Sequence, residues 1–240
     1  MIHALHGNFG LPSDWDAALP PGVPARAWHL WDIRRHHPEA LTLTGFATWF
    51  NDEVAALPDK GPRVLAGYSL GGRLALHVLQ DRPELWHRAL LLSTHPGLTT
   101  TAARQERLRH DLFWQTRCLT DPWPQVCAAW NAQPVLQSNA PLPDLTLLEP
   151  WRLEIAGAFS DWSLGQQEIP PHPLHISGYW ITGTQDVKFH SLDPTLLPGP
   201  FFNPLAAEGA GHRLLLEAPT MVRAILAQTP GDRHMKLPAP

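Results

Sequence analysis

The stretch GYSLGG at residues 67–72 follows the apolar run VLA at residues 64–66. Glycines on both sides of Ser69 indicate a sharp turn between a buried strand and a helix. Ser69 could simply cap that helix, because a serine oxygen accepts the free N–H groups of a first turn. Alternatively the turn is a nucleophile elbow, in which small neighbours relieve crowding and leave the serine oxygen exposed to substrate. The remainder of the chain distinguishes the two interpretations.

Short apolar runs alternate with segments of helical period on both sides of this turn. The pattern predicts strands over residues 2–5, 25–30, 64–68, 89–92 and 178–183, and helices over residues 44–57, 70–80 and 219–227. Such alternation is typical of a parallel sheet with helices on both faces. We therefore predict an α/β fold.

Residues 97–173 have a different character, with few β-branched runs and with helical patterns that prolines interrupt. A segment of this length is too long for a plain loop in a compact domain. We predict one α/β core made of residues 1–96 and 174–229, into which residues 97–173 are inserted as a helical cap. The cap is expected over the C-terminal edge of the sheet, where open α/β folds bind ligands. Residues 230–240 are expected to form a C-terminal tail.

Composition excludes several classes of partner. The net charge is −4 and no run of lysine or arginine occurs, which argues against nucleic acid. No apolar stretch approaches the roughly 20 residues that span a bilayer, and no signal segment begins the chain, so we expect a cytoplasmic protein without a membrane partner. Cys118 and Cys127 lack metal-type or redox-type spacing, and the His36-His37 pair has arginine and proline neighbours. We predict neither a metal nor a cofactor.

Two further residues stand in the chain order that a nucleophile elbow requires. Asp186 follows the strand over residues 178–183, and His212 ends the glycine turn GAGH at residues 209–212. Either residue alone is more often structural, as a turn or capping residue. Because acid and histidine follow the serine in the expected order, we predict that Ser69, Asp186 and His212 form a catalytic triad.

A triad of this kind also needs an oxyanion hole, which is made of two backbone N–H donors aimed at one point. Leu70 supplies one donor by its position directly after the nucleophile. The second is expected from the loop HGNFG at residues 6–10, where Asn8 is favoured over Phe9.

Four segments resemble the menaquinone-pathway synthases of 2-succinyl-6-hydroxy-2,4-cyclohexadiene-1-carboxylate. They are GYSLGGR at residues 67–73, HPGL at 95–98, WNAQPV at 130–135 and DVKF at 186–189. The resemblance covers most of the chain and implies an α/β-hydrolase fold that carries a lyase. The implied reaction eliminates pyruvate from a cyclohexene with an enolpyruvyl group and a succinyl side chain, in menaquinone or phylloquinone biosynthesis. In it the serine removes a carbon-bound proton, and no acyl-enzyme is needed.

The resemblance also implies substrate-binding roles for Tyr68, Arg73, Arg107, Trp130 and Arg152. The implied small-molecule substrate carries three carboxylates, which the planar fork of arginine binds in bidentate fashion. Arg73 lies one helical turn beyond Ser69 and can therefore face the same cavity.

Each of these residues also has a structural interpretation. Arg107 could belong to a solvated helix face, and Trp130 could be part of the cap core. In the cap, residues 136–159 are shorter than in the family, and WRLE at residues 151–154 replaces its usual asparagine-rich stretch.

Two other functions use the same fold. A small-molecule carboxylesterase or thioesterase would act through an acyl-Ser69 intermediate, and would have less use for arginines around its pocket. A non-catalytic binding protein would be expected to lack a member of the triad. Comparison of a neutral ester with the enolpyruvyl substrate discriminates between the two enzymes.

Overall fold

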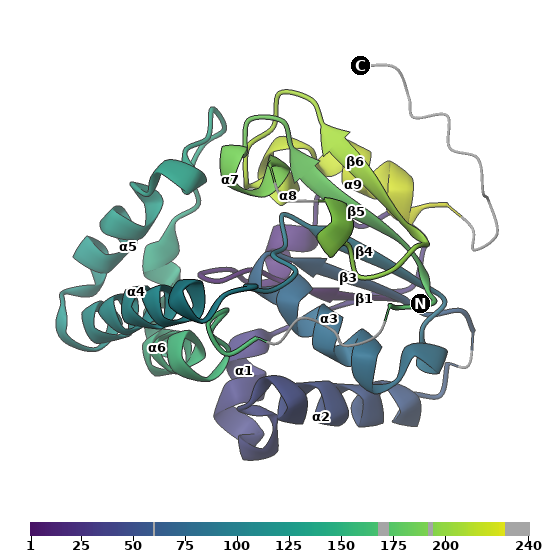
Figure 1. Ribbon diagram of the computed structural model, residues 1–240, viewed down its shortest axis with the longest axis horizontal. Coiled ribbons are helices and arrows are strands. Elements are labelled where there is room, and N and C mark those ends of the chain that lie inside the picture. The colour runs from purple at the N-terminus through teal and green to yellow at the C-terminus, as the bar shows by residue number, and fades with distance from the viewer. Residues whose placement is uncertain (60, 168–172, 192–193, 229–240) are drawn as a thin grey trace.

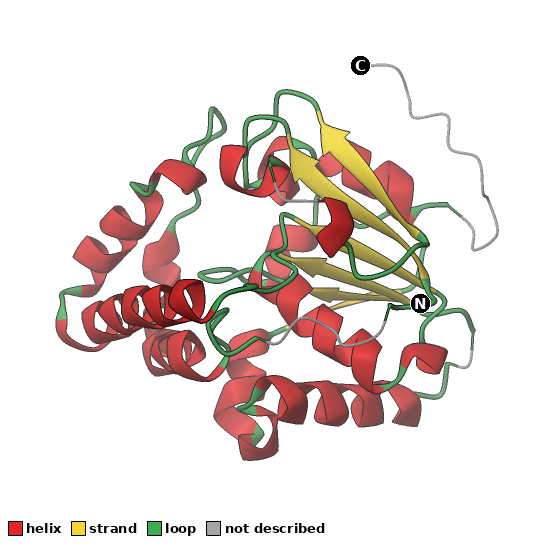
Figure 2. Cartoon of the chain, viewed as in Figure 1, coloured by secondary structure: helices red, strands yellow, loops and turns green. Residues whose placement is uncertain are grey.

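A computed structural model describes residues 1–59, 61–167, 173–191 and 194–228 of the protein. The predicted C-terminal tail, residues 230–240, lies outside the described residues. Figure 1 shows the chain from its N-terminus to its C-terminus, and Figure 2 shows how helices surround the strands.

The described strands form one parallel sheet of six strands in the order β2-β1-β3-β4-β5-β6. Their bounds are β1 Ile2–Leu5, β2 Ala25–Trp28, β3 Val64–Tyr68, β4 Arg88–Leu92, β5 Ser177–Gly183 and β6 Phe202–Ala207. The predicted parallel sheet is thus confirmed, and β6 is an additional strand. Because all strands run the same way, their carboxyl ends meet at one edge of the sheet.

Helices cover both faces of the sheet. One face carries α1 Leu30–His36, α2 Leu43–Ala56 and α3 Leu70–Asp81, whereas the other carries α8 Leu214–Glu217 and α9 Pro219–Leu226. Successive strand residues point to opposite faces, so Leu5 and Leu65 pack toward the first group while Ala4 and Val64 pack toward the second. A short helix, α7 Val187–His190, directly follows the turn after β5.

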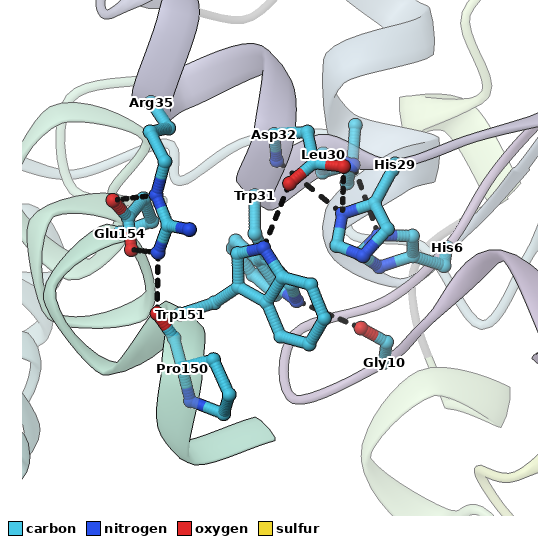
Figure 3. A network of polar contacts seen from close by, with 10 residues as sticks. All are labelled: His6, Gly10, His29, Leu30, Trp31, Asp32, Arg35, Pro150, Trp151 and Glu154. Carbon is cyan, nitrogen blue, oxygen red and sulfur yellow. Dashed lines mark hydrogen bonds and ion pairs between the residues drawn. The ribbon is translucent and has the colours of Figure 1, made fainter. Parts of the chain in front are cut away.

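The chain between β4 and β5 contains α4 Thr101–Thr120, α5 Trp123–Asn131 and α6 Arg152–Asp161. These helices lie beyond the carboxyl ends of the strands in Figure 1, with α4 packed against α6. Ion pairs join α6 to α1: Arg34 Nη2 lies 2.6 Å from Asp161 Oδ2, and Arg35 Nε lies 2.8 Å from Glu154 Oε1. The second of these pairs appears in Figure 3. The helical segment is therefore anchored to the sheet through α1.

No helix among the described residues is long and apolar enough to span a membrane.

Candidate active site

The turn after β3 holds Ser69 in a strained backbone conformation, with φ 52° and ψ −109°. Positive φ is unfavourable for a residue with a side chain and is concentrated at functional turns. The Ser69 N–H donates to the Leu92 carbonyl oxygen at 2.9 Å, which ties the turn to β4. A Cβ atom on Gly71 would lie 2.3 Å from the Leu5 carbonyl oxygen, so only glycine allows this approach of α3 to β1.

Ser69, His212 and Asp186 come together at the carboxyl edge of the sheet. His212 Nε2 lies 3.2 Å from Ser69 Oγ, and His212 Nδ1 lies 2.7 Å from Asp186 Oδ2. A carboxylate only accepts hydrogen bonds, so Nδ1 carries the proton and Nε2 is left to accept from the serine hydroxyl. Asp186 and His212 are 3% and 5% exposed, which shields their contact from water. This arrangement can activate Ser69 as a base or as a nucleophile.

The loop at residues 6–10 is fixed next to Ser69 by contacts with α1 (Figure 3). The Leu30 N–H donates to His6 Nε2 at 3.0 Å, and the Trp31 indole donates to the Gly10 carbonyl oxygen at 2.8 Å. His6 therefore carries its proton on Nδ1, which donates to the Gly7 carbonyl oxygen at 2.9 Å. Burial lowers the pKa of His6 to about 3, so this neutral form persists at ordinary pH.

The two expected oxyanion donors belong to residues of the same cleft. Asn8 and Leu70 both line the cleft in front of Ser69. Leu70 is the first residue of α3, where N–H groups have no intrahelical acceptor. Within the described residues, the N–H of Asn8 donates to no protein acceptor. The N–H of Phe9, in contrast, donates to Asn8 Oδ1 at 3.2 Å.

The cleft also brings in four of the five residues that the sequence assigns to substrate binding, namely Tyr68, Arg73, Arg107 and Trp130. Burial raises the pKa of the Tyr68 phenol, which stays protonated and can donate a hydrogen bond. Trp130 packs edge to face on Trp114, with ring centroids 4.9 Å apart, and also lines the cleft. It serves the cap core and the cleft together.

Arg73 is 7% exposed and projects from α3 into the cleft. Its Nη1 atom donates to the Trp162 carbonyl oxygen at 2.7 Å, and no described carboxylate forms an ion pair with it. Burial, together with the charge of Arg107, lowers the pKa of Arg73 to about 9. The charge of Asp111, which pairs with Arg107, acts only partly in the opposite direction. A buried cation that no carboxylate contacts is costly, and a bound anion would offset that cost.

Arg107 reaches the cleft from α4 and is held by a buried acid. Its Nε atom lies 2.8 and 2.9 Å from the two carboxylate oxygens of Asp111. Ser163 Oγ also donates to Asp111, at 2.6 Å. The Nε contact leaves the terminal nitrogens of Arg107 available to a ligand.

Lys188 and His95 also line the cleft, although the sequence analysis assigned them no role. Partial burial of the side chain, together with the charge of Arg107, lowers the pKa of Lys188. Burial and the charges of Lys188, Arg73 and Arg107 lower the pKa of His95 to about 4. The cleft is therefore strongly cationic around a neutral His95. The position of Lys188, two residues after Asp186, was the signal that could have revealed it.

Arg152 does not reach the cleft, which corrects its assignment to substrate binding. Its guanidinium donates to the carbonyl oxygens of Cys118 and Asp121, at the C-terminal end of α4. Its Cζ atom also lies 5.8 Å from the centre of the Trp123 ring. Free carbonyl groups at a helix end favour a cation, which explains this direction of the side chain.

Arg152→Ala is therefore expected to affect stability and not substrate binding. Loss of these contacts should cost about 1 kcal/mol and lower Tm by about 2–4 °C. Differential scanning calorimetry and steady-state kinetics on the same preparation check both effects. A tenfold rise in KM with an unchanged Tm would contradict this structural role.

No cluster of three metal-ligating side chains occurs within the described residues. The chemistry of the cleft is that of a serine-histidine-aspartate site surrounded by cations.

Comparison with known proteins identifies the family. The chain is 32% identical over 201 residues to a 2-succinyl-6-hydroxy-2,4-cyclohexadiene-1-carboxylate synthase of Pectobacterium atrosepticum, covering 78% of each chain. A synthase of the same name from Serratia proteamaculans is also 32% identical over 201 residues, with 78% of each chain covered. The chain belongs to the 2-succinyl-6-hydroxy-2,4-cyclohexadiene-1-carboxylate synthase family. No family model matches the chain.

Solved structures confirm the fold of this synthase-family member. A MenH structure from S. aureus superposes with a TM-score of 0.72 at 18% identity, covering 94% of this chain and 91% of the other. The epoxide hydrolase CorEH superposes with a TM-score of 0.67 at 18% identity, covering 93% and 88%. The fold is thus the predicted α/β-hydrolase fold.

Proposed function

We propose that the protein is a lyase that eliminates pyruvate from an enolpyruvyl-succinyl-cyclohexene-carboxylate. The product is 2-succinyl-6-hydroxy-2,4-cyclohexadiene-1-carboxylate, an intermediate on the route to menaquinone or phylloquinone. The family assignment supports this reaction, because the curated relatives carry the name of this synthase. The proposed catalytic residues are Ser69, His212 and Asp186, and the proposed oxyanion donors are the N–H groups of Leu70 and Asn8.

In the proposed mechanism His212 Nε2 accepts the Ser69 hydroxyl proton while Ser69 Oγ removes a proton from carbon. The carbon concerned is the ring carbon next to the ketone of the succinyl chain, because its electron pair delocalises onto the ketone oxygen and is conjugated through the ring double bond with the carbon that loses the enolpyruvyl group. The resulting enolate oxygen would receive hydrogen bonds from the N–H groups of Leu70 and Asn8. Collapse of the enolate breaks the carbon–oxygen bond to the enolpyruvyl group, and a proton from imidazolium completes the release of pyruvate.

The observation that carries this proposal is the buried Arg73 guanidinium, which lines the Ser69 cleft without a carboxylate partner among the described residues. Arg107 and Lys188 add further positive charge at the same cleft. A polycarboxylate substrate offsets the cost of burying Arg73, whereas a neutral ester leaves it uncompensated. The cleft therefore favours the lyase over a carboxylesterase or thioesterase that uses the same triad.

Turnover of the enolpyruvyl substrate should release pyruvate stoichiometrically and without a covalent enzyme intermediate. A coupled lactate dehydrogenase assay measures the pyruvate, and intact-mass spectrometry of enzyme quenched during turnover tests for an adduct on Ser69. A p-nitrophenyl ester series measured in parallel gives the hydrolase activity. A trapped acyl-Ser69 from the natural substrate, or ester hydrolysis in the absence of pyruvate release, would establish the hydrolase instead.

A further inference from the structure

A second pocket adjoins the catalytic cleft on the side of the oxyanion loop. The two pockets adjoin, because Asn8, Tyr68, Trp130 and Leu136 line both of them. The second pocket adds Arg213, the residue directly after the catalytic histidine. None of the functions described above uses Arg213.

Arg213 is 9% exposed and rigidly held. Its Nε atom donates to the Leu136 carbonyl oxygen at 2.9 Å, and its Nη2 atom donates to Asn131 Oδ1 at 2.6 Å. Both partners are neutral, and no carboxylate of the described residues forms an ion pair with this guanidinium. Arg213 is therefore a second buried cation that no described carboxylate contacts directly, although Glu217 and Asp14 lie near enough to favour its charge.

Two carboxylates near Arg213 are engaged elsewhere. Asp14, which also lines the second pocket, accepts the Leu11 N–H at 3.1 Å, and Glu217 accepts the Gly211 N–H at 2.7 Å. Burial raises the pKa of Asp14 to about 6, although the Leu11 hydrogen bond and the charge of Arg213 act in the opposite direction. The free donors of Arg213 are left for a ligand.

We infer that Arg213 forms an anion subsite that binds the terminal carboxylate of the substrate's succinyl chain. The inference rests on the proposed function, because the substrate's shape comes from it. The ketone of that chain is the group whose oxygen Asn8 would stabilise, and its carboxylate lies two methylene groups beyond the ketone carbon. Asn8 lines both pockets, so a chain whose ketone binds at Asn8 is within reach of the pocket of Arg213.

With this subsite, the arginines of the two pockets can bind all three carboxylates of the proposed substrate. Arg73 and Arg107 serve the cleft side, and Arg152 is occupied by the end of α4. Arg213 supplies a further cation in the adjoining pocket, where a carboxylate that extends past Asn8 would lie.

The test uses a stable aromatic analogue of the product, 4-(2-carboxyphenyl)-4-oxobutanoate, and its terminal amide, in which only the chain carboxylate is neutralised. Isothermal titration calorimetry at pH 7.5 compares the wild type with three variants. Arg213→Gln should raise the Kd of the acid about tenfold or more and leave that of the amide within about twofold.

Two further variants serve as controls. Asp14→Asn should lower the Kd of the acid and not of the amide, because it removes a nearby negative charge. Asn131→Ala removes one tether of Arg213 but keeps its charge, and should change the acid's Kd less than Arg213→Gln.

The outcomes separate the subsite from the function. Equal Kd values of the acid for wild type and Arg213→Gln, or equal losses on acid and amide, would overturn the subsite while pyruvate release in the wild type still supports the lyase. An Asn131→Ala loss as large as that of Arg213→Gln would show that Arg213 only positions the cap. A wild type that releases no pyruvate and binds neither compound would refute the proposed function itself, and the subsite with it.

Discussion

Ser69→Ala is expected to lower kcat for pyruvate release by about a thousandfold or more, with a circular dichroism spectrum unchanged from the wild type. The proposed chemistry passes through the Ser69 oxygen, which contacts His212 Nε2 at 3.2 Å. Alanine keeps the Cβ atom and the strained turn, so the fold loses little. Near-wild-type turnover by this variant would eliminate the proposed mechanism.

Asp186→Asn should produce a comparable loss for a different reason. An asparagine side chain can donate to His212 Nδ1, which favours the tautomer that cannot accept the serine proton. Its oxygen can still accept the Phe189 N–H, as Asp186 Oδ1 does at 3.3 Å, so the turn into α7 is retained. Because the three residues act as a unit, the Ser69→Ala, Asp186→Asn double variant should be hardly slower than Ser69→Ala alone. Additive losses would show that Asp186 acts independently of the triad.

The elbow and its partners were predictable because the constraint is local and ordered. Gly67 and Gly71 can be read from the sequence as the small residues that a strand-to-helix turn needs, and β3 has the predicted bounds. The acid and the histidine each follow a later strand of the same parallel sheet. Because the turns after parallel strands lie at one edge of the sheet, the two residues meet the serine there. Chain order carries this information without any knowledge of side-chain packing.

The strand predictions differ from the structure in one end point and one omission. The predicted strand over residues 25–30 ends at Trp28, because His29 caps α1 by accepting the Asp32 N–H on its side chain. β6 was missed because Pro204 interrupts its apolar pattern. Proline is tolerated there because β6 is an edge strand, and edge positions do not require every N–H donor.

The cationic residues show where sequence reasoning stops. Arg73 lies one helical turn after Ser69, and residues at that spacing share a helix face. The sequence alone therefore predicts that Arg73 faces the cleft. The direction of Arg152 depends instead on how α6 packs against the end of α4, which no short-range pattern encodes. The environment of Arg213 likewise depends on Asn131 and Leu136, which are distant in the sequence.

Arg73→Met is expected to reduce kcat/KM for the enolpyruvyl substrate by at least tenfold while leaving Tm equal to or above that of the wild type. Loss of a desolvated contact between guanidinium and carboxylate costs about 2–5 kcal/mol, because the substrate's charge is left unpaired. The protein alone gains from the same change, since a buried cation without a counter-ion is replaced by an apolar side chain of similar length. The Trp162 carbonyl oxygen loses the hydrogen bond from Arg73 in this variant, which reduces the gain in the free energy of unfolding.

Arg73→Lys separates charge from geometry, because lysine keeps the cation but not the planar fork that binds a carboxylate through two nitrogens. Its kcat/KM should fall between those of the wild type and Arg73→Met. Hydrolysis of a neutral p-nitrophenyl ester, measured on the same three proteins, should hardly change wherever it is detectable. A fall in Tm accompanied by equal losses on both substrates would mean that Arg73 supports the fold. If kcat/KM falls only for the polycarboxylate substrate and Tm is unchanged, the charge of Arg73 is buried for substrate recognition.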